Sequence, residues 1–134
     1  MKDCIFCKII NKEIDSFEIY EDDIVKVFLD ENPKSNGHLL VVPKKHYENI
    51  FDTPKKVLAK INEVCKEMAQ LCKQKLDCDG VNIVNASGKE AQQSVFHLHY
   101  HVVPRYENDN IDLWFHGQSE DIKEIKEVYN KLKN

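Results

Sequence analysis

Three histidines alternate with apolar residues in the run FHLHYHVV, residues 96–103, and this alternation constrains the fold more than any other feature of the sequence. Successive side chains of a strand point to opposite faces of a sheet, so the run predicts a strand that presents its histidines on one face. The opposite face of that strand is apolar and needs a packed layer; its residues are Phe96, Leu98, Tyr100 and Val102. The chain must therefore form a sheet with one packed face and with imidazoles on the other.

The imidazoles of His97, His99 and His101 are too far apart to bind one ion together. A strand advances about 3.3 Å per residue, so neighbouring histidine Cα atoms lie about 6.6 Å apart and the outer pair about 13 Å apart. Zinc–nitrogen bonds are about 2.0–2.1 Å long, so at most two of the three can share an ion. A single strand histidine is usually a half-buried polar residue with a satisfied hydrogen bond. Three in strict alternation indicate that this face binds a ligand or carries out a reaction.

Other periodic segments predict the elements around this strand. Apolar residues at helical spacing predict a short helix over residues 3–11 with Asp3 as its N-cap, a long helix capped by Thr53, and a final amphipathic helix after Ser119. Strands are predicted at residues 17–20, 24–29, 38–42, 81–85 and 95–103, the last one ended by Pro104. This order predicts an α+β fold: an antiparallel sheet of about five strands, with the long helix packed on it and the helices on one face.

Length, charge and cysteine content exclude several classes of protein. The chain has 134 residues, and we expect a single domain over residues 1–134, with a core at 4–105 and a tail and helix at 106–134. A net charge of −4 argues against a domain that wraps nucleic acid, because that role needs a basic face. No segment suits a signal peptide or a membrane span, and five cysteines do not suit a secreted disulfide framework. We expect a cytoplasmic protein with no nucleic-acid or membrane partner.

The run FHLHYHVVPR resembles the histidine triad signature, in which three histidines alternate with apolar residues near the end of a compact α+β domain. The similarity extends through CIFCKIINKEI, EDDIVKVFLD, GHLLVVPKKH, VNIVN and QQSV, and so covers nearly all of residues 4–105. This resemblance implies the histidine triad fold, a homodimer and a purine nucleotide substrate. It also implies hydrolysis of the α-phosphate linkage of nucleotide phosphoramidates or dinucleoside polyphosphates.

The same resemblance implies the catalytic residues. His99, the middle histidine, matches the nucleophile that attacks the α-phosphorus and forms a nucleotidyl-histidine intermediate. A neutral imidazole suits this role near pH 7, provided that its other nitrogen holds a proton. His101 matches a partner of the phosphate or the leaving group, and His38 matches the fourth histidine that lines the site. Ser94 matches the residue that hydrogen-bonds near the leaving atom.

Substrate-binding residues are implied in the same way. Asn85 and Gln93 match residues on the phosphate side of the site, while Asp30 matches the residue that binds the ribose hydroxyls and reads equally well as a turn residue. Gln92 stands where relatives commonly carry glycine, which puts in doubt a close approach of that backbone to phosphate. Four apolar residues match the pocket that encloses the base, and a core role explains them as well: Ile5, Phe6, Ile9 and Phe28.

Cys4 and Cys7 form a Cys-x-x-Cys pair, which is half of a structural zinc site. Resemblance to a zinc-bearing branch of the histidine triad proteins, and to the related galactose-1-phosphate uridylyltransferases, implies His46 and His97 as the other two ligands. The competing interpretation is a redox dithiol, but such a pair usually follows a strand in a parallel unit, and no strand is predicted before Cys4. Zinc would then fix His97 and leave His99 free to react.

A second functional hypothesis is a non-catalytic, nucleotide-binding and zinc-stabilised interaction module. Such a module would keep the pocket without turning over a substrate. The presence of His38, His101 and Ser94 favours the enzyme, because binding alone does not need all three.

Overall fold

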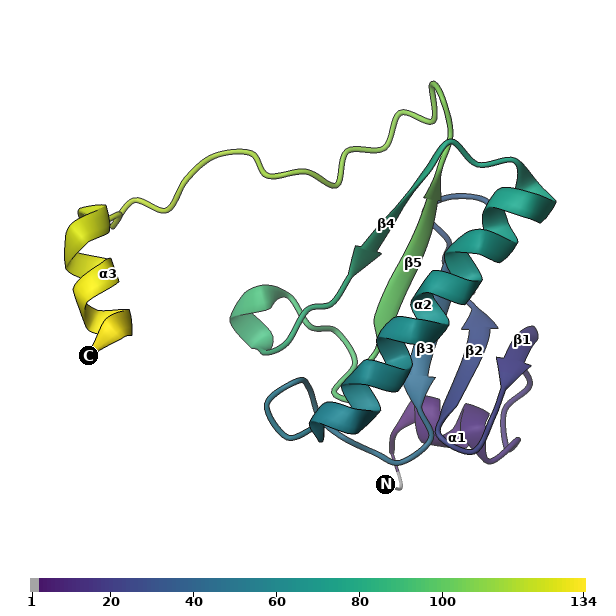
Figure 1. Cartoon of the computed structure of the whole chain (residues 1–134). Coiled ribbons are helices and arrows are strands. Elements are labelled where there is room, and N and C mark those ends of the chain that lie inside the picture. The colour runs from purple at the N-terminus through teal and green to yellow at the C-terminus, as the bar shows by residue number, and fades with distance from the viewer. Residues whose placement is uncertain (1–2) are drawn as a thin grey trace.

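A computed structural model describes residues 3–134, and its centre is a five-stranded antiparallel sheet of order β1-β2-β3-β5-β4 (Figure 1). The strands are β1 (Glu18–Glu21), β2 (Val25–Leu29), β3 (Leu39–Pro43), β4 (Gly80–Val84) and β5 (Tyr100–Arg105). The helices are α1 (Ile5–Ile10), α2 (Lys55–Leu76) and α3 (Ile125–Lys133), with a 3-10 turn at Lys89–Ala91. The predicted α+β fold is confirmed.

Helices cover both faces of the sheet, so the prediction that they share one face is wrong. On one face, Ile61, Val64 and Met68 of α2 pack in a core that includes Val27, Val41 and Leu98. On the other, Phe6 and Ile9 of α1 pack against Phe28, Leu40 and Val42. The reason is the composition of the central strands: nearly every residue of β2 and β3 is buried, and strands of that kind need cover on both sides.

The strand predicted to carry the histidines, β5, begins later and ends later than predicted, so that it contains His101 alone of the three. Leu98 N–H donates to Tyr47 O at 2.7 Å, so the chain ahead of Tyr100 pairs with a loop and not with the sheet. The strand continues through Pro104. Pairing between β3 and β5 ends at Leu39 opposite Val102, so Pro104 is paired with β4 alone. A residue without an N–H is tolerated where only one neighbouring strand remains. Phe96, predicted to pack, is 46% exposed.

Two predicted N-caps are also wrong. Thr53 Oγ1 donates to Asn49 O at 2.6 Å, and the cap position of α2 is taken by Pro54 without a side-chain bond. Cys4, and not Asp3, caps α1: its Sγ accepts from the N–H of Cys7 at 3.3 Å. The first turn of α1 is thus organised by a cysteine pair.

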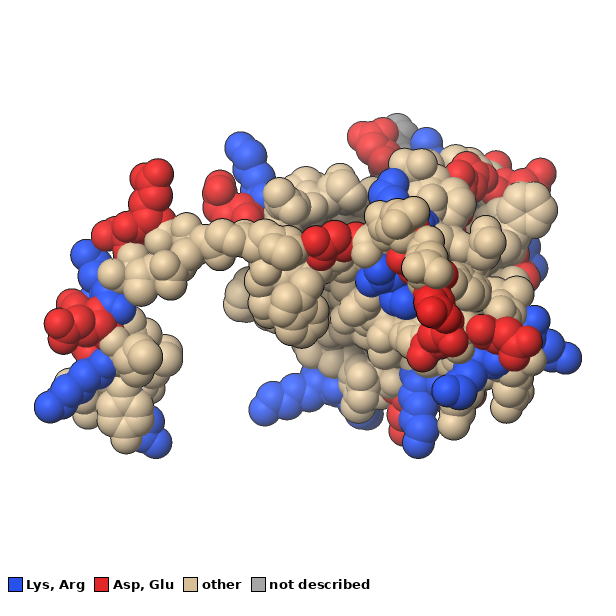
Figure 2. Space-filling model, turned by 90° about the horizontal axis from the view of Figure 1, so that it is seen from above, with Lys and Arg blue, Asp and Glu red and all other residues tan. Residues whose placement is uncertain are grey.

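The C-terminal segment leaves the sheet and carries α3 away from it (Figures 1 and 2). The last helix was predicted after Ser119, but α3 begins at Ile125, since residues 106–124 follow an irregular path. Every residue of α3 is exposed, including Ile125 at 87% and Leu132 at 81%. The predicted apolar stripe is present, and within residues 3–134 it packs on nothing.

Candidate functional site

A cavity of about 660 Å³ opens on the α1 side of the sheet. It lies between α1, the loop that follows β2, and the segment that precedes β5. The structure brings most of the predicted nucleotide-site residues to its wall, which includes Ile5, Phe6, Ile9, Phe28, Asp30, His38, Ser94, His99 and His101. These residues come from segments far apart in the sequence, so the cavity exists only in the folded chain.

His99 has a fixed tautomer. Its Nδ1 lies 2.8 Å from the carbonyl oxygen of His97, and a carbonyl oxygen can only accept, so Nδ1 carries the proton. Its Nε2 therefore keeps a lone pair. Burial lowers the pKa of His99, which keeps the ring neutral at pH 7. The cavity is thus lined by a neutral imidazole whose Nε2 is unprotonated, which is the form in which an imidazole can act as a nucleophile.

A chain of hydrogen bonds sets the tautomers of His38 and His101 as well. The N–H of Lys34 donates to His38 Nδ1 at 3.0 Å, so neutral His38 carries its proton on Nε2. That Nε2–H faces His101 Nδ1 at 2.9 Å, which leaves the proton of His101 on its own Nε2. Burial first, and then the neighbouring His99 and His38, lower the pKa of His101 to about 4. His101 is therefore a neutral hydrogen-bond donor in the cavity wall.

The same tautomers argue against a metal at this end of the cavity. Ligand atoms of Asp30, His38 and His101 lie within 4.8 Å of one another, with Asp30 Oδ2 at 3.6 Å from His38 Nε2. A metal bound at His38 Nε2 would move the proton to Nδ1, where it would meet the N–H of Lys34. Two donors facing each other are unfavourable. The three side chains fit a hydrogen-bonded group better than a metal site.

Asn85, predicted to bind substrate, contacts the protein backbone next to the cavity. It is not among the described residues that line the cavity. Its Nδ2 donates to the carbonyl oxygen of His99 at 3.0 Å, and its Oδ1 accepts from Ser87 Oγ at 2.8 Å. The amide thereby fixes the chain at His99.

Gln93 is also absent from the part of the cavity wall formed by residues 3–134. It is buried, its Oε1 accepts from Gly88 N–H at 2.8 Å, and its Nε2 donates to the carbonyl oxygens of Glu48 and Val95 at 2.6 and 3.0 Å. Its neighbour Gln92 does line the cavity, with a left-handed φ of 70°. The backbone at residue 92 thus keeps a conformation that glycine adopts at least cost, and adds an amide side chain to the wall.

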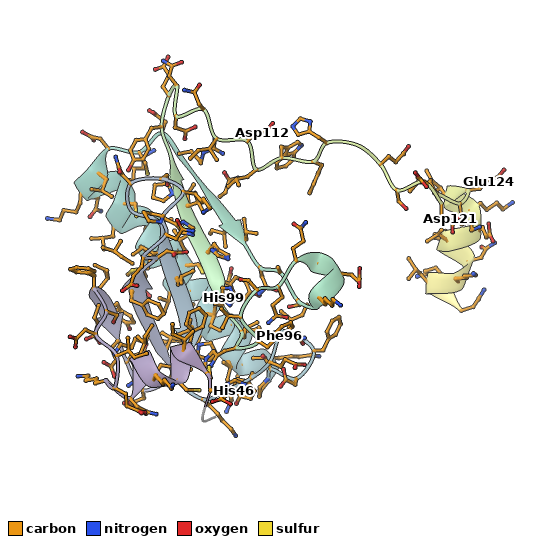
Figure 3. The ribbon with its side chains drawn as sticks, turned by 180° about the vertical axis from the view of Figure 1, so that it is seen from behind. His46, Phe96, His99, Asp112, Asp121 and Glu124 are labelled. Carbon is orange, nitrogen blue, oxygen red and sulfur yellow. The ribbon has the colours of Figure 1, made fainter. Side chains whose placement is uncertain are left out.

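Cys4, Cys7, His46 and His97 converge at the N-terminal end of α1, and their ligand atoms lie within 4.8 Å of one another. His97 donates from Nε2 to Pro43 O at 2.9 Å, so the lone pair of its Nδ1 faces the group. From that Nδ1, Cys4 Sγ lies at 3.3 Å, Cys7 Sγ at 3.5 Å and His46 Nδ1 at 3.1 Å. Figure 3 shows His46 and His99 at the same end of the sheet. Two sulfurs and two imidazole nitrogens in so compact a group suit tetrahedral zinc.

Electrostatics favour a cation in this group. Burial, and then the neighbouring sulfur of Cys4, raise the pKa of Cys7. A pair of thiolates is therefore costly here without a compensating charge, which a divalent ion supplies. The donor set and its surroundings fit a thiophilic divalent metal.

Lys26 is a residue of this region that sequence reasoning missed. Its side chain is only 2% exposed, and its Nζ lies 3.4 Å from Ile9 O, 3.5 Å from Glu18 Oε1 and 3.8 Å from Glu21 Oε1. It therefore links the last turn of α1 to β1 and β2. The available signal was a lysine between two valines in IVKVFL, on the same strand face as Phe28.

Known proteins resemble this chain along most of its length. The HIT domain family model matches residues 11–108. An uncharacterized HIT-like protein of Methanocaldococcus jannaschii is 47% identical over 130 residues, covering 97% of this chain and 98% of that protein. Adenosine 5'-monophosphoramidase HNT1 of Saccharomyces cerevisiae is 34% identical over 130 residues, covering 96% and 80%.

Solved structures share the fold. SMU.412c from Streptococcus mutans superposes with a TM-score of 0.89 at 34% identity, covering 99% of this chain and 85% of that one. A zinc-bound histidine triad family protein from Mycobacterium smegmatis superposes with a TM-score of 0.81 at 38% identity, covering 84% and 81%.

Proposed function

The chain belongs to the HIT domain family, and we propose that it is a hydrolase that cleaves the α-phosphate linkage of purine nucleotides through a nucleotidyl-histidine intermediate. The substrates would be phosphoramidates or dinucleoside polyphosphates. The observation that carries the proposal is the tautomer of His99, whose Nδ1–H is bound to His97 O and whose Nε2 is unprotonated. The phosphoramidase name of the yeast relative supports the same class of reaction.

In the first step, the Nε2 lone pair of His99 attacks the α-phosphorus. The new P–N bond forms while the bond to the leaving group breaks, and the leaving atom departs with the electron pair. His99 then carries positive charge, which the carbonyl oxygen of His97 stabilises at Nδ1–H. Water next attacks the phosphorus, and the P–N bond breaks with its electron pair returning to His99 Nε2. One proton of the water stays on the released nucleoside monophosphate, and the other passes through solvent to the departed leaving group.

The neighbouring residues stabilise the charge that develops in these steps. His101 presents Nε2–H to a phosphoryl oxygen or the leaving atom, and His38 holds it in that tautomer. Ser94 lines the cavity as a further donor, and Asp30 is the ribose-hydroxyl acceptor. Asn85 and Gln93 hold the backbone next to the cavity and thereby position the residues that contact the substrate.

The apolar wall of the cavity is the base subsite. Ile5, Phe6 and Ile9 of α1, together with Phe28 and Leu40, form one apolar wall that a planar base can lie against. Burying that ring against apolar side chains favours a purine over a smaller base, because more apolar surface leaves water.

Zinc is proposed as a structural ion at Cys4, Cys7, His46 and His97, supported by the convergence of these residues and by the zinc-bound relative. When bound, it would supply a cross-link between α1, the turn after β3 and the segment before β5. The protein residues around it orient His97, whose carbonyl oxygen in turn orients His99.

A homodimer in the cytoplasm is proposed as the working form. The edge strand β4 leaves Ile83 46% and Val84 38% exposed, and α3 adds a second apolar surface, as expected for a face that a second copy covers. None of the five cysteines forms a disulfide, which suits a reducing compartment. Within residues 3–134, no helix has the length and apolar content that a membrane crossing requires.

Replacing His99 with glycine tests the proposed chemistry. We expect kcat to fall by about 10³-fold or more toward AMP and GMP amidates and dinucleotides, while AMP still binds. Mass spectrometry of quenched wild-type reactions should detect a nucleotidyl adduct on His99. His116→Gly, at an exposed histidine in the tail, is the matched control and should retain full activity.

Two outcomes would contradict the proposal. Full activity of His99→Gly would exclude covalent catalysis by this residue. AMP binding by the wild type without turnover or adduct, across the whole substrate panel, would instead identify a nucleotide-binding module.

A further inference from the structure

Helix α1 contributes to two sites at once. Cys4 caps it and Cys7 lies in its first turn, and both converge with His46 and His97. From the same helix, Ile5, Phe6 and Ile9 line the nucleotide cavity. A displacement of α1 would therefore alter both the metal group and the base subsite.

Helix α1 depends on contacts with the rest of the protein to stay folded. The helix has six residues, which is too short to be stable on its own. Phe6 and Ile9 pack in the smaller of the two apolar cores, and Lys26 binds the carbonyl oxygen of Ile9. A ligand that binds at either end of α1 adds to these contacts and so further fixes the helix.

Phe6 joins the two sites directly. Its ring lies edge-on to both histidines, with centroids 5.8 Å from His97 and 5.1 Å from His99. The two histidines are themselves linked, since His97 O accepts from His99 Nδ1–H. Ring packing and this hydrogen bond thus provide a continuous physical connection from the cysteine pair to the cavity.

From these contacts we infer that α1 couples the two sites energetically, so that nucleotide monophosphate binding tightens zinc binding and zinc tightens nucleotide binding. The inference rests on the proposed function, because it requires the cavity to bind a nucleotide. Each ligand fixes the same helix, so the second to bind has less left to order. Coupling between binding sites is reciprocal, and the two affinities must change by one common factor.

The full-length protein allows a direct measurement. Zinc dissociation constants are measured by competition with a chromophoric chelator, with and without saturating AMP. We expect AMP to lower the zinc dissociation constant by about tenfold, within the usual range of coupling between sites. Calorimetry of AMP binding to zinc-loaded and zinc-depleted protein should give the same factor.

A pair of variants localises the coupling. Phe6→Leu removes the ring between the two histidines, and we expect it to reduce the coupling factor below about twofold. Ile61→Val shortens a fully buried side chain on α2, on the opposite face of the sheet, and should leave the factor unchanged. An equal reduction in both variants would show that general stability, and not α1, carries the coupling, and would overturn the inference.

Hydrogen exchange gives a readout that needs no variant. Zinc alone and AMP alone should each slow exchange of the α1 amides, and both together should slow it further. AMP binding that leaves zinc affinity and α1 exchange unchanged would overturn this inference alone. Absence of AMP binding would overturn the proposed function and this inference with it, and absence of zinc binding would also overturn the inference.

Discussion

At the scale of single residues, backbone groups decide what each imidazole can do. The carbonyl oxygens of His97 and Pro43 place protons on His99 Nδ1 and His97 Nε2. The N–H of Lys34 donates to His38 Nδ1, which leaves the proton of His38 on Nε2. Four chemically identical side chains therefore divide into the proposed nucleophile, the proposed metal ligand and a linked pair of donors.

His101 should make the stability of the protein depend on pH. Its folded pKa is about 4, below its ordinary value of 6.5, so between these values the unfolded chain binds the additional proton. The free energy of unfolding should therefore fall as the pH drops from 6.5 toward 4. Urea unfolding across this range should show a slope that His101→Asn reduces by up to about 1.4 kcal/mol per pH unit.

An unaltered slope in His101→Asn would show that the ring is not held neutral by burial.

At the scale of elements, α2 supports the loop that carries His38. Gly37 packs against the end of α2 and β5: a Cβ added there would lie 2.5 Å from Leu76 Cδ1 and 3.2 Å from Pro104 Cγ. Tyr106 Oη also donates to Asn36 O at 2.8 Å. The loop between β2 and β3 is thereby fixed by three other segments, and with it the N–H that sets the tautomer of His38.

Three glycine-to-alanine variants separate the causes of this constraint. Gly37 combines a φ of 93° with close packing, Gly88 has a φ of 101° in open space, and Gly80 has neither constraint. We expect Gly37→Ala to lower the free energy of unfolding by about 2 kcal/mol or more and Gly88→Ala by about 1 kcal/mol. Gly80→Ala should change it by less than about 0.5 kcal/mol. Urea denaturation of all three measures the order, and equal values would refute it.

Predictions of helices and strands were correct where local periodicity defines the element. They were wrong where contacts between distant segments set its ends. The long helix and the hairpin of β1 and β2 follow from spacing alone. The start of β5 does not, because Leu98 N–H pairs with Tyr47 O, a contact between distant segments. The cavity residues were reached through motif resemblance, whereas the roles of Asn85, Gln93 and Lys26 depend on hydrogen bonds that no spacing specifies.

At the scale of the whole molecule, the compact part ends shortly after β5 and an exposed arm follows. Arg105 binds Asp109 with two nitrogens at 2.9 Å, and the same carboxylate accepts from the N–H of Tyr106 and of Ile111 at 3.0 Å. This group fixes the chain as it leaves the sheet. Beyond it, Trp114 and Phe115 are 70% and 81% exposed.

Limited proteolysis should therefore cut first within residues 113–124. The backbone there makes few hydrogen bonds, whereas the Asp109 carboxylate protects residues 105–111. Mass spectrometry of the earliest fragments should show a stable piece that ends after residue 112. A first cut within residues 30–38 or 86–94 would contradict this expectation, and protection of 113–124 at high protein concentration would indicate that a second copy covers the arm.

The buried ammonium of Lys26 also restricts the order in which such a sequence can be assembled by mutation. Glu18 and Glu21 keep side-chain exposures of 35% and 29%, so each carboxylate remains hydrated when no lysine faces it. An ammonium that is 2% exposed has no such alternative and is strongly unfavourable without its partners. Replacing both glutamates should therefore cost far less stability in a chain that already lacks the lysine than in this one.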